Sequence, residues 1–379
     1  MTGIACRACR GSAGQLVLDL GAQPPCDFFP LAGDPGPDPE YPLQMWLCAS
    51  CGLAQLAADP TVPEEPRGAE PAALSQQAAD AVGRVASAGL LPAGHRVAEY
   101  GSPHGGSWLG LLSSRGLRPV SGTETADVVL DCFGLMHAAD QREALAGRAA
   151  TVAPGGVLLL QYHSLETIIR CGQWNALRHG HYAYYSTTAL IAMLAACGLS
   201  PRTAWRFDLY GGTVLLAAVR QAGPAAGSGP DGAVRALLAE EARTGVRDPA
   251  ALAGLQRGAQ VRADALRAWL VDEQAAGRSV LGYGAASRAV ALLRWARADR
   301  GLLAAVADAS PAKQGLRMPG TDIPVVSPQL LGEQKPDSVV LFVDDLMAEV
   351  RAAYPQVEAA GGRWISAEQF GAAASPVRA

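Results

Sequence analysis

The chain has 379 residues and a formal net charge of −4 at pH 7; 49% of the residues are hydrophobic and 17% are charged. This length predicts two or three domains with cores of their own, and the composition excludes a disordered chain. The charge argues against a protein that binds duplex DNA through a basic face. The sequence has neither a long apolar span nor a secretory leader, so we expect a cytoplasmic chain without a membrane partner.

Two Cys-x-x-Cys pairs stand near the start of the chain, Cys6 with Cys9 and Cys48 with Cys51. In the cytoplasm they are thiols or metal ligands rather than disulfides. Four thiolates in two tight turns suit tetrahedral Zn²⁺, and with no open position the ion would be structural. Unrelated buried thiols or redox-active pairs are the alternatives. The favoured interpretation is a zinc-binding module over residues 1–65, in which the metal supplements a small core.

Residues 66–222 are predicted to alternate helices and strands. We expect helices at about 73–88, 107–114, 140–152 and 188–196, and strands at 96–100, 118–121, 126–131, 157–161 and 213–219. This βαβ order predicts a parallel sheet. A Gly-, Pro- and Ala-rich linker over 221–232 follows.

The last part of the chain repeats the pattern. A helical spacer is expected over 233–278, and strands are expected at 279–283, 303–307 and 338–342 within a domain of residues 279–379. The predicted fold class is therefore α/β: a small zinc module, a Rossmann-like domain, a helical spacer and a second Rossmann-like domain.

Motifs spread over nearly the whole chain resemble, in the same order, the zinc-containing, S-adenosylmethionine-dependent sugar C-methyltransferases. That family acts on nucleotide-linked 4-keto-6-deoxysugars in antibiotic pathways. Besides the two cysteine pairs, the motifs are Tyr41-Pro42-Leu43, Gln55-Leu56, Glu99-x-Gly101-Ser102-x-x-Gly105, His137-x-x-Asp140, His179-Gly180-His181-Tyr182, Gly282-Tyr283-Gly284-Ala285, Lys313-Gln314-Gly315 and Pro319-Gly320-Thr321.

The resemblance implies that the middle domain binds S-adenosylmethionine. Glu99, Gly101 and Gly105 would form the cofactor loop, and Glu124, after the second strand, would hold the ribose. A tight turn without a ligand is the alternative. The family has Asn-Asp where this chain has Pro103-His104. The 30 residues from Gly101 to Asp131 also leave no room for a helix and strand that such domains usually have, so we expect a shortened domain.

The reactive region departs from the family's Tyr-His-Glu-His run, because this chain has Arg178-His179-Gly180-His181. The resemblance implies that His181 is the base that removes a proton next to a carbonyl, and that His137 belongs to the active site. We count His179 and Arg178 as further catalytic candidates, although the histidines could be structural and Arg178 could hold a phosphate or carboxylate.

Substrate-binding residues are expected at the ends of strands. His163 follows a central strand, where open α/β sheets bind ligands. In the last domain the candidates are a helix start that suits an anion, an acid at the spacing of a ribose ligand, and a nearby cation. These residues are Tyr283, Gly284, Arg288, Asp308 and Lys313. A structural Rossmann-like unit without a ligand is the alternative.

Three functions follow from these residues. The first is an S-adenosylmethionine-dependent C-methyltransferase that acts on a nucleotide-linked deoxysugar or a related small molecule. The second is a homologue that has lost the cofactor and performs acid–base chemistry as an isomerase, epimerase, dehydratase or cyclase. The third is a non-catalytic partner protein. We expect a small-molecule substrate and no nucleic-acid partner; the sequence leaves the oligomeric state open.

Overall fold

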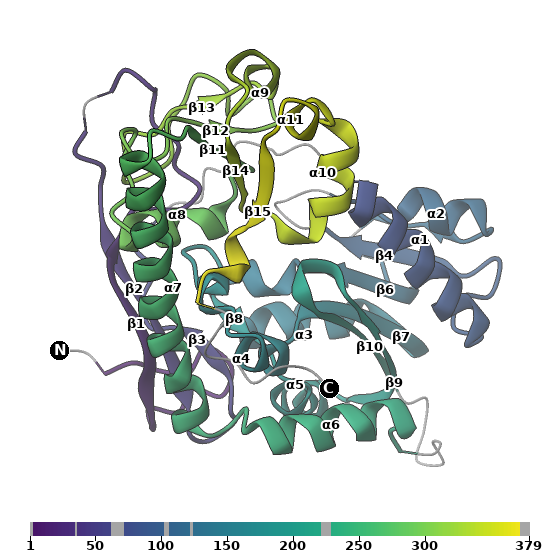
Figure 1. Cartoon of the computed structure of the whole chain (residues 1–379). Coiled ribbons are helices and arrows are strands. Elements are labelled where there is room, and N and C mark those ends of the chain that lie inside the picture. Colours follow the sequence, from purple (N-terminus) through teal and green to yellow (C-terminus); the bar gives the residue numbers. More distant parts are fainter. Residues whose placement is uncertain are drawn as a thin grey trace.

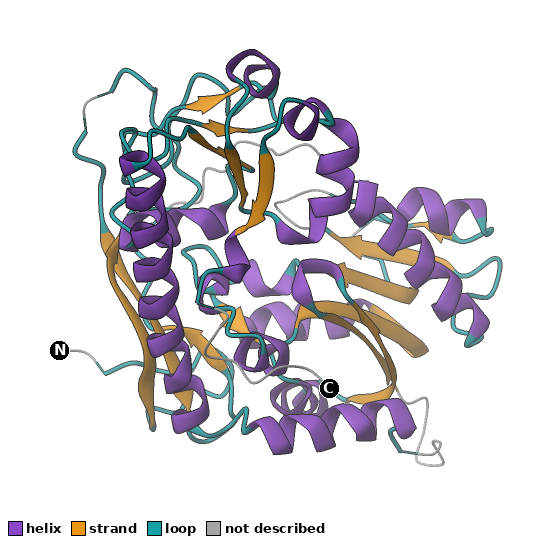
Figure 2. Ribbon diagram, viewed as in Figure 1, coloured by secondary structure: helices purple, strands orange, loops and turns teal. Residues whose placement is uncertain are grey.

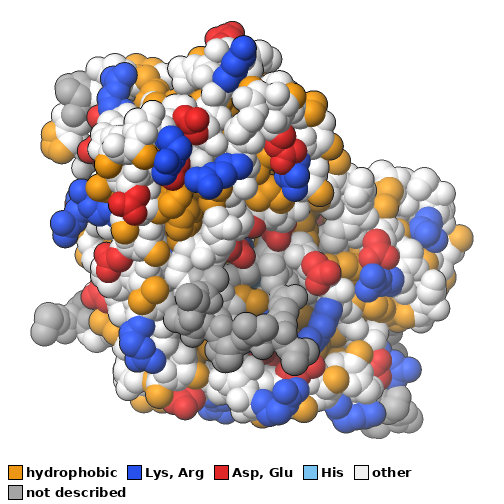
Figure 3. Space-filling model, in the orientation of Figure 1, with side chains coloured by type: hydrophobic (Ala, Val, Ile, Leu, Met, Phe, Trp, Pro, Cys, Tyr) orange, Lys and Arg blue, Asp and Glu red, His pale blue; other side chains and the backbone are white. Residues whose placement is uncertain are grey.

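A computed structural model describes residues 3–34, 36–61, 72–101, 106–121, 124–220 and 229–371. Its strands form three separate sheets, and helices lie between and around them (Figures 1 and 2). Among the described helices, none combines the length and the apolarity that crossing a membrane requires. Figure 3 shows Lys and Arg side chains interspersed with Asp and Glu over the face in view.

The N-terminal sheet is antiparallel and has four strands in the order β1-β2-β3-β8. Its first three strands are β1 (Gly14–Gln23), β2 (Tyr41–Cys48) and β3 (Ala54–Leu56). The fourth, β8 (Ala183–Tyr184), comes from the middle of the chain and pairs with β3. The predicted zinc module therefore shares its sheet with a later segment, directly beyond the His179–His181 run.

The central sheet has six strands in the order β5-β4-β6-β7-β10-β9. The first four run parallel, and β10 is antiparallel to both of its neighbours. Their bounds are β4 (Arg96–Tyr100), β5 (Arg118–Pro119), β6 (Ala126–Cys132), β7 (Val152–His163), β9 (Leu199–Phe207) and β10 (Thr213–Arg220). Strand β7 is longer than the predicted 157–161, since the chain around Gly155 stays in the sheet across a register irregularity.

Helices cover both faces of the central sheet because its strands are apolar on both sides. Val128 and Leu130 of β6 pack with α1 (Ala72–Ser87) and α2 (Leu109–Ser114). Val129, on the other face, packs with α3 (Gln141–Thr151) and α5 (Thr187–Ala196). The short helix α4 (Leu165–Arg170) follows β7. This sandwich is the architecture expected of a parallel sheet with βαβ connections.

The central sheet ends at β5. Only residues 120–125 connect β5 to β6, and the described residues among them form neither a helix nor a strand. The strand order therefore agrees with the shortened cofactor domain that the Gly101–Asp131 interval predicts.

The predicted spacer is two helices rather than one. Helix α6 (Gly232–Thr244) ends at Gly245, which adopts the left-handed conformation, and α7 (Pro249–Ala275) restarts with Asp248 as its N-cap. Helix α7 also does more than separate domains, because Leu252, Leu255 and Leu266 are buried in a core shared with the N-terminal sheet and the last domain. In Figure 1 it runs along β1 and β2.

The C-terminal sheet is parallel, with the order β13-β12-β11-β14-β15. Its strands are β11 (Val280–Tyr283), β12 (Val306–Ala307), β13 (Val325–Val326), β14 (Ser338–Leu341) and β15 (Arg363–Ser366). Its helices are α8 (Ser287–Trp295), α9 (Gln329–Gln334), α10 (Met347–Ala353) and α11 (Gln356–Ala359). After β11 the chain forms β12 and β13 on one side of that strand, and it then returns to form β14 and β15 on the other side. The strand order therefore reverses beside β11.

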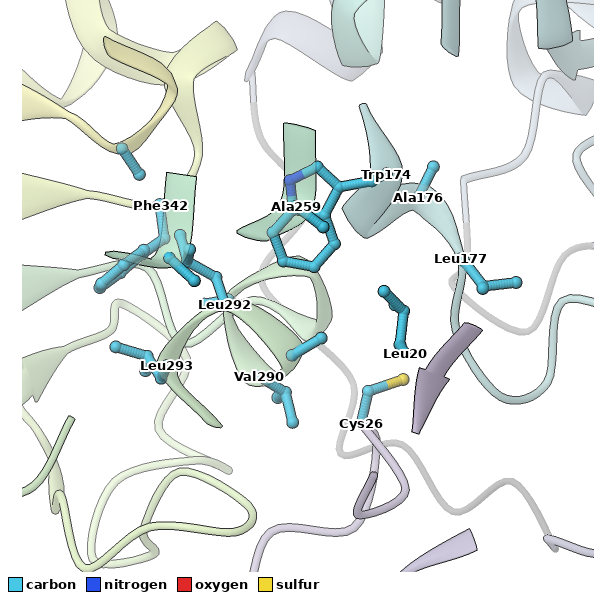
Figure 4. Close-up of a cluster of buried hydrophobic side chains, with 14 of the residues drawn as sticks. Leu20, Cys26, Trp174, Ala176, Leu177, Ala259, Val290, Leu292, Leu293 and Phe342 are labelled. Carbon is cyan, nitrogen blue, oxygen red and sulfur yellow. The ribbon is translucent and has the colours of Figure 1, made fainter. Parts of the chain in front are cut away.

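One hydrophobic core joins the N-terminal sheet, the segment after β7, helix α7 and the C-terminal domain. Leu20 from β1, Trp174, Ala259 from α7 and Val290 from α8 all belong to it (Figure 4). The rings of Trp174 and Trp295 stack with centroids 6.0 Å apart. Because fully burying such side chains contributes roughly 1.5–3 kcal/mol each, this core fixes the N-terminal sheet against the C-terminal sheet. The candidate site lies between them and the central sheet.

Candidate functional site

The four N-terminal cysteines form one cluster. Cys6 Sγ lies 3.5 Å from Cys51 Sγ, Cys9 Sγ lies 3.6 Å from Cys48 Sγ, and all four sulfurs lie within 4.8 Å of one another. Sulfurs about 2.3 Å from a tetrahedral zinc ion would be about 3.8 Å apart. The donor set and its spacing therefore fit a structural Zn²⁺ ion with four thiolate ligands.

The first cysteine knuckle contacts the loop that carries His137. The Arg10 guanidinium pairs with Asp140, the N-cap of α3, and Arg7 Nη1 donates to the carbonyl of Ala139 at 2.9 Å. The Arg7 guanidinium also lies 4.7 Å from the centre of the Tyr182 ring. The zinc site thus supports the two segments that hold His137 and His181.

His137 and His181 are brought together from different segments. Their ring centroids are 4.6 Å apart and nearly perpendicular. His137 ends the 3-10 turn η1 (Leu135–His137), whose start is fixed by Asp131 Oδ1, which accepts from the N–H groups of Gly134 and Leu135. His137 Nδ1 donates to the Gly180 carbonyl at 3.0 Å. The two histidines implied by the family resemblance therefore share one site.

Arg178 contacts both His181 and the C-terminal domain. Its Nε lies 2.8 Å from His181 Nε2 and 3.3 Å from His181 Nδ1, and its Nη1 donates to the Ser287 hydroxyl at the start of α8. The Arg178 backbone is held by the buried Tyr184 hydroxyl, which accepts from the Arg178 N–H at 3.0 Å. These contacts connect His181, through Arg178, to the start of α8 in the C-terminal domain.

His179 lies apart from this pair. Its side chain is 2% exposed, its Nε2 is 3.3 Å from the Pro42 carbonyl, and its ring is edge-on to Tyr41. Burial lowers the pKa of His179, so it is neutral near pH 7. These contacts place His179 against the N-terminal sheet, and a catalytic role for it stays a prediction.

Gly180 occupies the position where the family has Glu. Its φ of +80° lies in the left-handed region, and its N–H donates to Asp59 Oδ2 at 2.6 Å. A side chain is strained in that conformation. The backbone turn between the two histidines therefore requires glycine.

Replacing Gly180 with Ala should lower the free energy of unfolding by about 1–2 kcal/mol, the cost of a left-handed L-residue. Urea unfolding of the purified chain measures this. The matched control is Gly147→Ala within α3, where a Cβ meets nothing within 4 Å; it should be neutral or stabilising because alanine favours helices. Equal stability of Gly180→Ala and wild type would contradict the assigned turn.

His163 ends β7 and is buried. Its Nε2 donates to Gln173 Oε1 at 2.8 Å, and its side chain is 8% exposed. Burial, and then the nearby Arg288 cation, lower the pKa of His163 to about 3. Desolvation and repulsion both disfavour an imidazolium here, so His163 is a neutral hydrogen-bond donor across the working pH range.

This depressed pKa predicts acid sensitivity. Because the folded-state pKa of His163 lies below the unfolded value of about 6.5, its stabilising contribution is present above pH 6.5 and is lost as the pH falls towards 3. We expect wild type to lose about 2 kcal/mol from this residue between pH 7.5 and pH 5. Denaturant unfolding of wild type and His163→Gln at both pH values measures it; the same pH slope in both would contradict the prediction.

The carboxyl edges of two sheets meet at His163. Thr213, the first residue of β10, pairs with His163, so the preceding turn η3 (Leu209–Gly211) lies at that edge. Both terminal nitrogens of Arg288, on α8, lie 3.4–3.5 Å from the Tyr210 carbonyl in this turn. Ligands of open α/β sheets bind at such edges. The carboxyl edges of the central and C-terminal sheets are therefore adjacent at this point.

The cofactor-loop candidates lie at the end of β4. Glu99 accepts from the Trp108 N–H at 2.7 Å and from the Ser107 hydroxyl, and so fixes the far end of the loop. A Cβ at Gly101 would meet nothing within 4 Å. Glu124 is exposed and accepts from the Ser121 hydroxyl. Gly105 lies outside the described residues.

These residues fit one end of S-adenosylmethionine. A Cβ at Gly101 would meet none of the described atoms within 4 Å, and the exposed Glu124 carboxylate can accept from ribose hydroxyls, as acids at this position do. Beyond β5 the described residues add no further strand on the adenine side. The fit therefore covers the loop and ribose positions.

In the C-terminal domain two candidates hold the loop after β11. Asp308 accepts from the N–H of Ala285 at 2.7 Å and from that of Ser310 at 2.8 Å. Lys313, 5% exposed, donates to the Ala285 carbonyl at 2.9 Å and lies over the ring of Phe29. These contacts connect the loop to the N-terminal region, and substrate binding by either residue stays a prediction.

Tyr283 and Arg288 differ in their surroundings. Tyr283 is buried in a hydrophobic cluster beside Tyr354 and Trp364, away from the cleft edge. Gly284, with φ +90°, has Val343 so close that a Cβ would lie 2.8 Å from it. Arg288, in contrast, lines a narrow cavity beside β11 and β14 with Arg262, Asp344 and Glu368. Of these candidates, Arg288 is the one placed at the point where the strand order reverses.

Three contact residues escaped sequence reasoning. Asp59 holds Gly180, Ser287 holds Arg178, and Gln173 holds His163. Asp59 and Gln173 lie in segments without a motif of their own, so no local pattern marked them. Ser287 lies within the helix start between Gly284 and Arg288, but it was not singled out as a candidate.

Two family models match the chain. One, described as "C-methyltransferase C-terminal domain", matches residues 208–367, and the other, "Putative zinc binding domain", matches residues 6–64. The second contains all four clustered cysteines. These matches support the sugar C-methyltransferase family for this chain. The resemblance stated from the sequence motifs is thereby confirmed.

A curated relative of this chain is the C-methyltransferase NovU of Streptomyces niveus. The two are 29% identical over 240 residues, which cover 62% of this chain and 54% of the relative. The match thus spans about half the length of that relative.

Solved structures with a similar fold include the N-methyltransferase NodS of Bradyrhizobium japonicum WM9 with S-adenosyl-L-homocysteine (16% identity, 39% of this chain and 87% of that chain, TM-score 0.30). Another is the magnesium protoporphyrin IX methyltransferase of Synechocystis PCC 6803 (16% identity, 39% and 84%, TM-score 0.28).

Proposed function

We propose that the chain is an S-adenosylmethionine-dependent C-methyltransferase that acts on a nucleotide-linked deoxysugar, with His181 as the base. The observation that carries this is the placement of His137, Arg178 and His181 where the carboxyl edges of two Rossmann-like sheets meet. The matches to the C-methyltransferase C-terminal domain and to the zinc-binding domain support it.

In this proposal the central sheet binds the cofactor and the C-terminal sheet binds the substrate. Gly101 and Glu124 hold the cofactor at the end of the central sheet, and Arg288 binds the nucleotide-linked substrate at the end of the C-terminal sheet. When bound, S-adenosylmethionine supplies an electrophilic methyl group. The cofactor and the substrate would then meet at the edge of the sheets beside His181.

The proton chemistry belongs to His181. A neutral imidazole can take the proton from the carbon next to a ketone, and the enolate carbon that results is the nucleophile for the methyl group. The Arg178 guanidinium, beside His181, offsets the negative charge that develops on the enolate oxygen. His137 holds the Gly180 carbonyl and thereby fixes the turn that carries His181.

The test is turnover with a nucleotide-linked 4-keto-6-deoxysugar. We expect a product in which one methyl replaces one hydrogen, with an equal amount of S-adenosylhomocysteine, both measured by mass spectrometry. A sugar of unchanged mass across a panel of such substrates would reject the proposal.

A second candidate function is proton chemistry without methyl transfer. The central sheet that ends at β5 favours it, because the adenine side of the cofactor then has fewer walls. It predicts uptake of solvent deuterium, or an isomerised sugar of equal mass, in the absence of S-adenosylmethionine. Uptake of deuterium that depends on the cofactor would instead favour the methyltransferase.

A further inference from the structure

Phe133 lies at the carboxyl edge of the central sheet. It follows Cys132, the last residue of β6, and its half-buried side chain packs against the hydrophobic clusters on both faces of the sheet. A side chain can contact both faces only where the sheet ends. The Phe133 ring therefore lies over the edge at which open α/β sheets bind their ligands.

The backbone of Phe133 is strained. Its φ of +62° lies in the left-handed region, which bulky L-residues rarely adopt. The turn that contains it is held by the buried Asp131, whose Oδ1 accepts from the N–H groups of Gly134 and Leu135 and whose Oδ2 pairs with Arg148. Strain of this kind persists where the surrounding structure fixes it, and it is concentrated at ligand sites.

The same turn contacts the cofactor loop. Gly134 is so close to Gly101 that a Cβ on it would lie 2.9 Å from the Gly101 carbonyl oxygen. The rings of Phe133 and Tyr210 meet edge to face with centroids 5.9 Å apart, and the Arg288 guanidinium lies 5.9 Å from the centre of the Tyr210 ring. An edge-to-face pair leaves at least one face of the Phe133 ring uncovered by Tyr210.

Negative charge surrounds this edge of the sheet. Burial first, and then the negative charges of Asp131 and Glu99, raise the pKa of the Cys132 thiol. Arg148 pairs with Asp131, whereas the Glu99 carboxylate accepts from neutral donors, which do not offset its charge. An electron-rich ring face close to a carboxylate favours a cation.

We propose that Phe133 is the binding residue that recognises the positively charged sulfur of S-adenosylmethionine through a cation–π contact. This inference rests on the proposed function and adds a contact to those of Gly101 and Glu124. Transfer of the methyl group leaves S-adenosylhomocysteine, whose sulfur is neutral, so the ring attracts the cofactor but not the spent product. The contact thereby favours exchange of product for fresh cofactor.

The test compares these two ligands, which differ by one methyl group and one positive charge, in calorimetric titrations of the full, zinc-bound chain. We expect Phe133→Leu to weaken the binding of S-adenosylmethionine by about threefold to tenfold and to leave that of S-adenosylhomocysteine nearly unchanged. Leucine needs the same backbone conformation, so a merely structural role would weaken both ligands alike. Phe133→Tyr keeps the ring and should keep the wild-type ratio of the two affinities.

Phe370→Leu is the matched control. Phe370 also belongs to an aromatic pair, with Trp269 of α7 at a centroid distance of 5.3 Å, but it packs in the core outside the central sheet. This variant should bind both ligands as wild type does. Circular dichroism melts establish that each variant is folded.

Fluorine atoms on the Phe133 ring supply a second measurement if Phe133→Leu does not fold. They withdraw electron density from the ring face and change its size little. We expect the affinity for S-adenosylmethionine to fall with each added fluorine, while the affinity for S-adenosylhomocysteine stays constant.

Equal weakening of both ligands in Phe133→Leu, unchanged binding of both, or an affinity indifferent to fluorination overturns the inference and leaves the proposed function standing. A charge-dependent loss without methyl transfer to any nucleotide-linked sugar would do the reverse. Failure of both ligands to bind wild type would overturn the two together.

Discussion

Replacing Cys48 with Ser should release the zinc ion and destabilise the chain by several kcal/mol, more than any other single substitution considered. The free energy of structural zinc binding in small domains is about 10–16 kcal/mol, and much of it is folding energy. Cys48 ends β2 and is buried in the core, with its sulfur 3.6 Å from Cys9 Sγ.

The effect should extend beyond the zinc module. Strand β3 pairs with both β2 and β8, and β8 follows directly after His181 and Tyr182. Loss of the metal therefore loosens the turn that carries the base. We expect a lower midpoint of thermal unfolding together with loss of turnover.

Zinc content by atomic absorption and unfolding by denaturant measure the prediction together. Cys171→Ser is the matched control, since Cys171 is half-buried at the end of α4 and lies outside the cluster. It should retain zinc and stability. A wild-type chain without zinc, or a Cys48→Ser chain as stable as wild type, would contradict the assignment.

Replacing His181 with Asn should lower the turnover number by about 10² to 10⁴, the usual contribution of a general base. Asn is close in size and can still accept the hydrogen bond from Arg178, but it cannot take a proton from carbon. The affinities for cofactor and substrate should change little, because the loss falls on the chemical step.

Steady-state kinetics measures the change, with His95→Asn as the control. His95 lies in the turn before β4, far along the chain from the paired histidines, and its replacement should leave turnover near wild type. A His181→Asn chain that retains turnover within a few-fold would show that another group is the base.

The sequence predicted the elements whose pattern is local. The apolar runs of β6 and β7, each followed by a turn or helix start, could be predicted because a buried parallel strand is marked by its own residues. The short interval after Gly101 likewise predicted a sheet that ends at β5.

Strand β8 shows why other elements were missed. Ala183 and Tyr184 form a strand because they pair with Gln55 and Ala54, more than a hundred residues earlier. The same limit applies to α7, whose buried leucines contact sheets on either side of it. Two residues carry no periodicity, and pairing of distant segments is decided by tertiary packing.

The candidate site likewise combines residues that local motifs predicted with contacts that only tertiary packing decides. The cysteine pairs could be predicted because ligand spacing is local chemistry, and the histidines because their motif is. The contact between Arg178 and Ser287 joins positions 109 residues apart, and that between Gly180 and Asp59 joins positions 121 apart. Such partners are set by how the sheets meet, which no motif records.

Binding of S-adenosylmethionine to the full-length, zinc-bound chain is best tested by a calorimetric titration. We expect saturable binding of one cofactor per chain, weakened when the Glu124 carboxylate is removed by Glu124→Gln and unchanged in an Arg351→Gln control. No binding up to millimolar S-adenosylmethionine would contradict it.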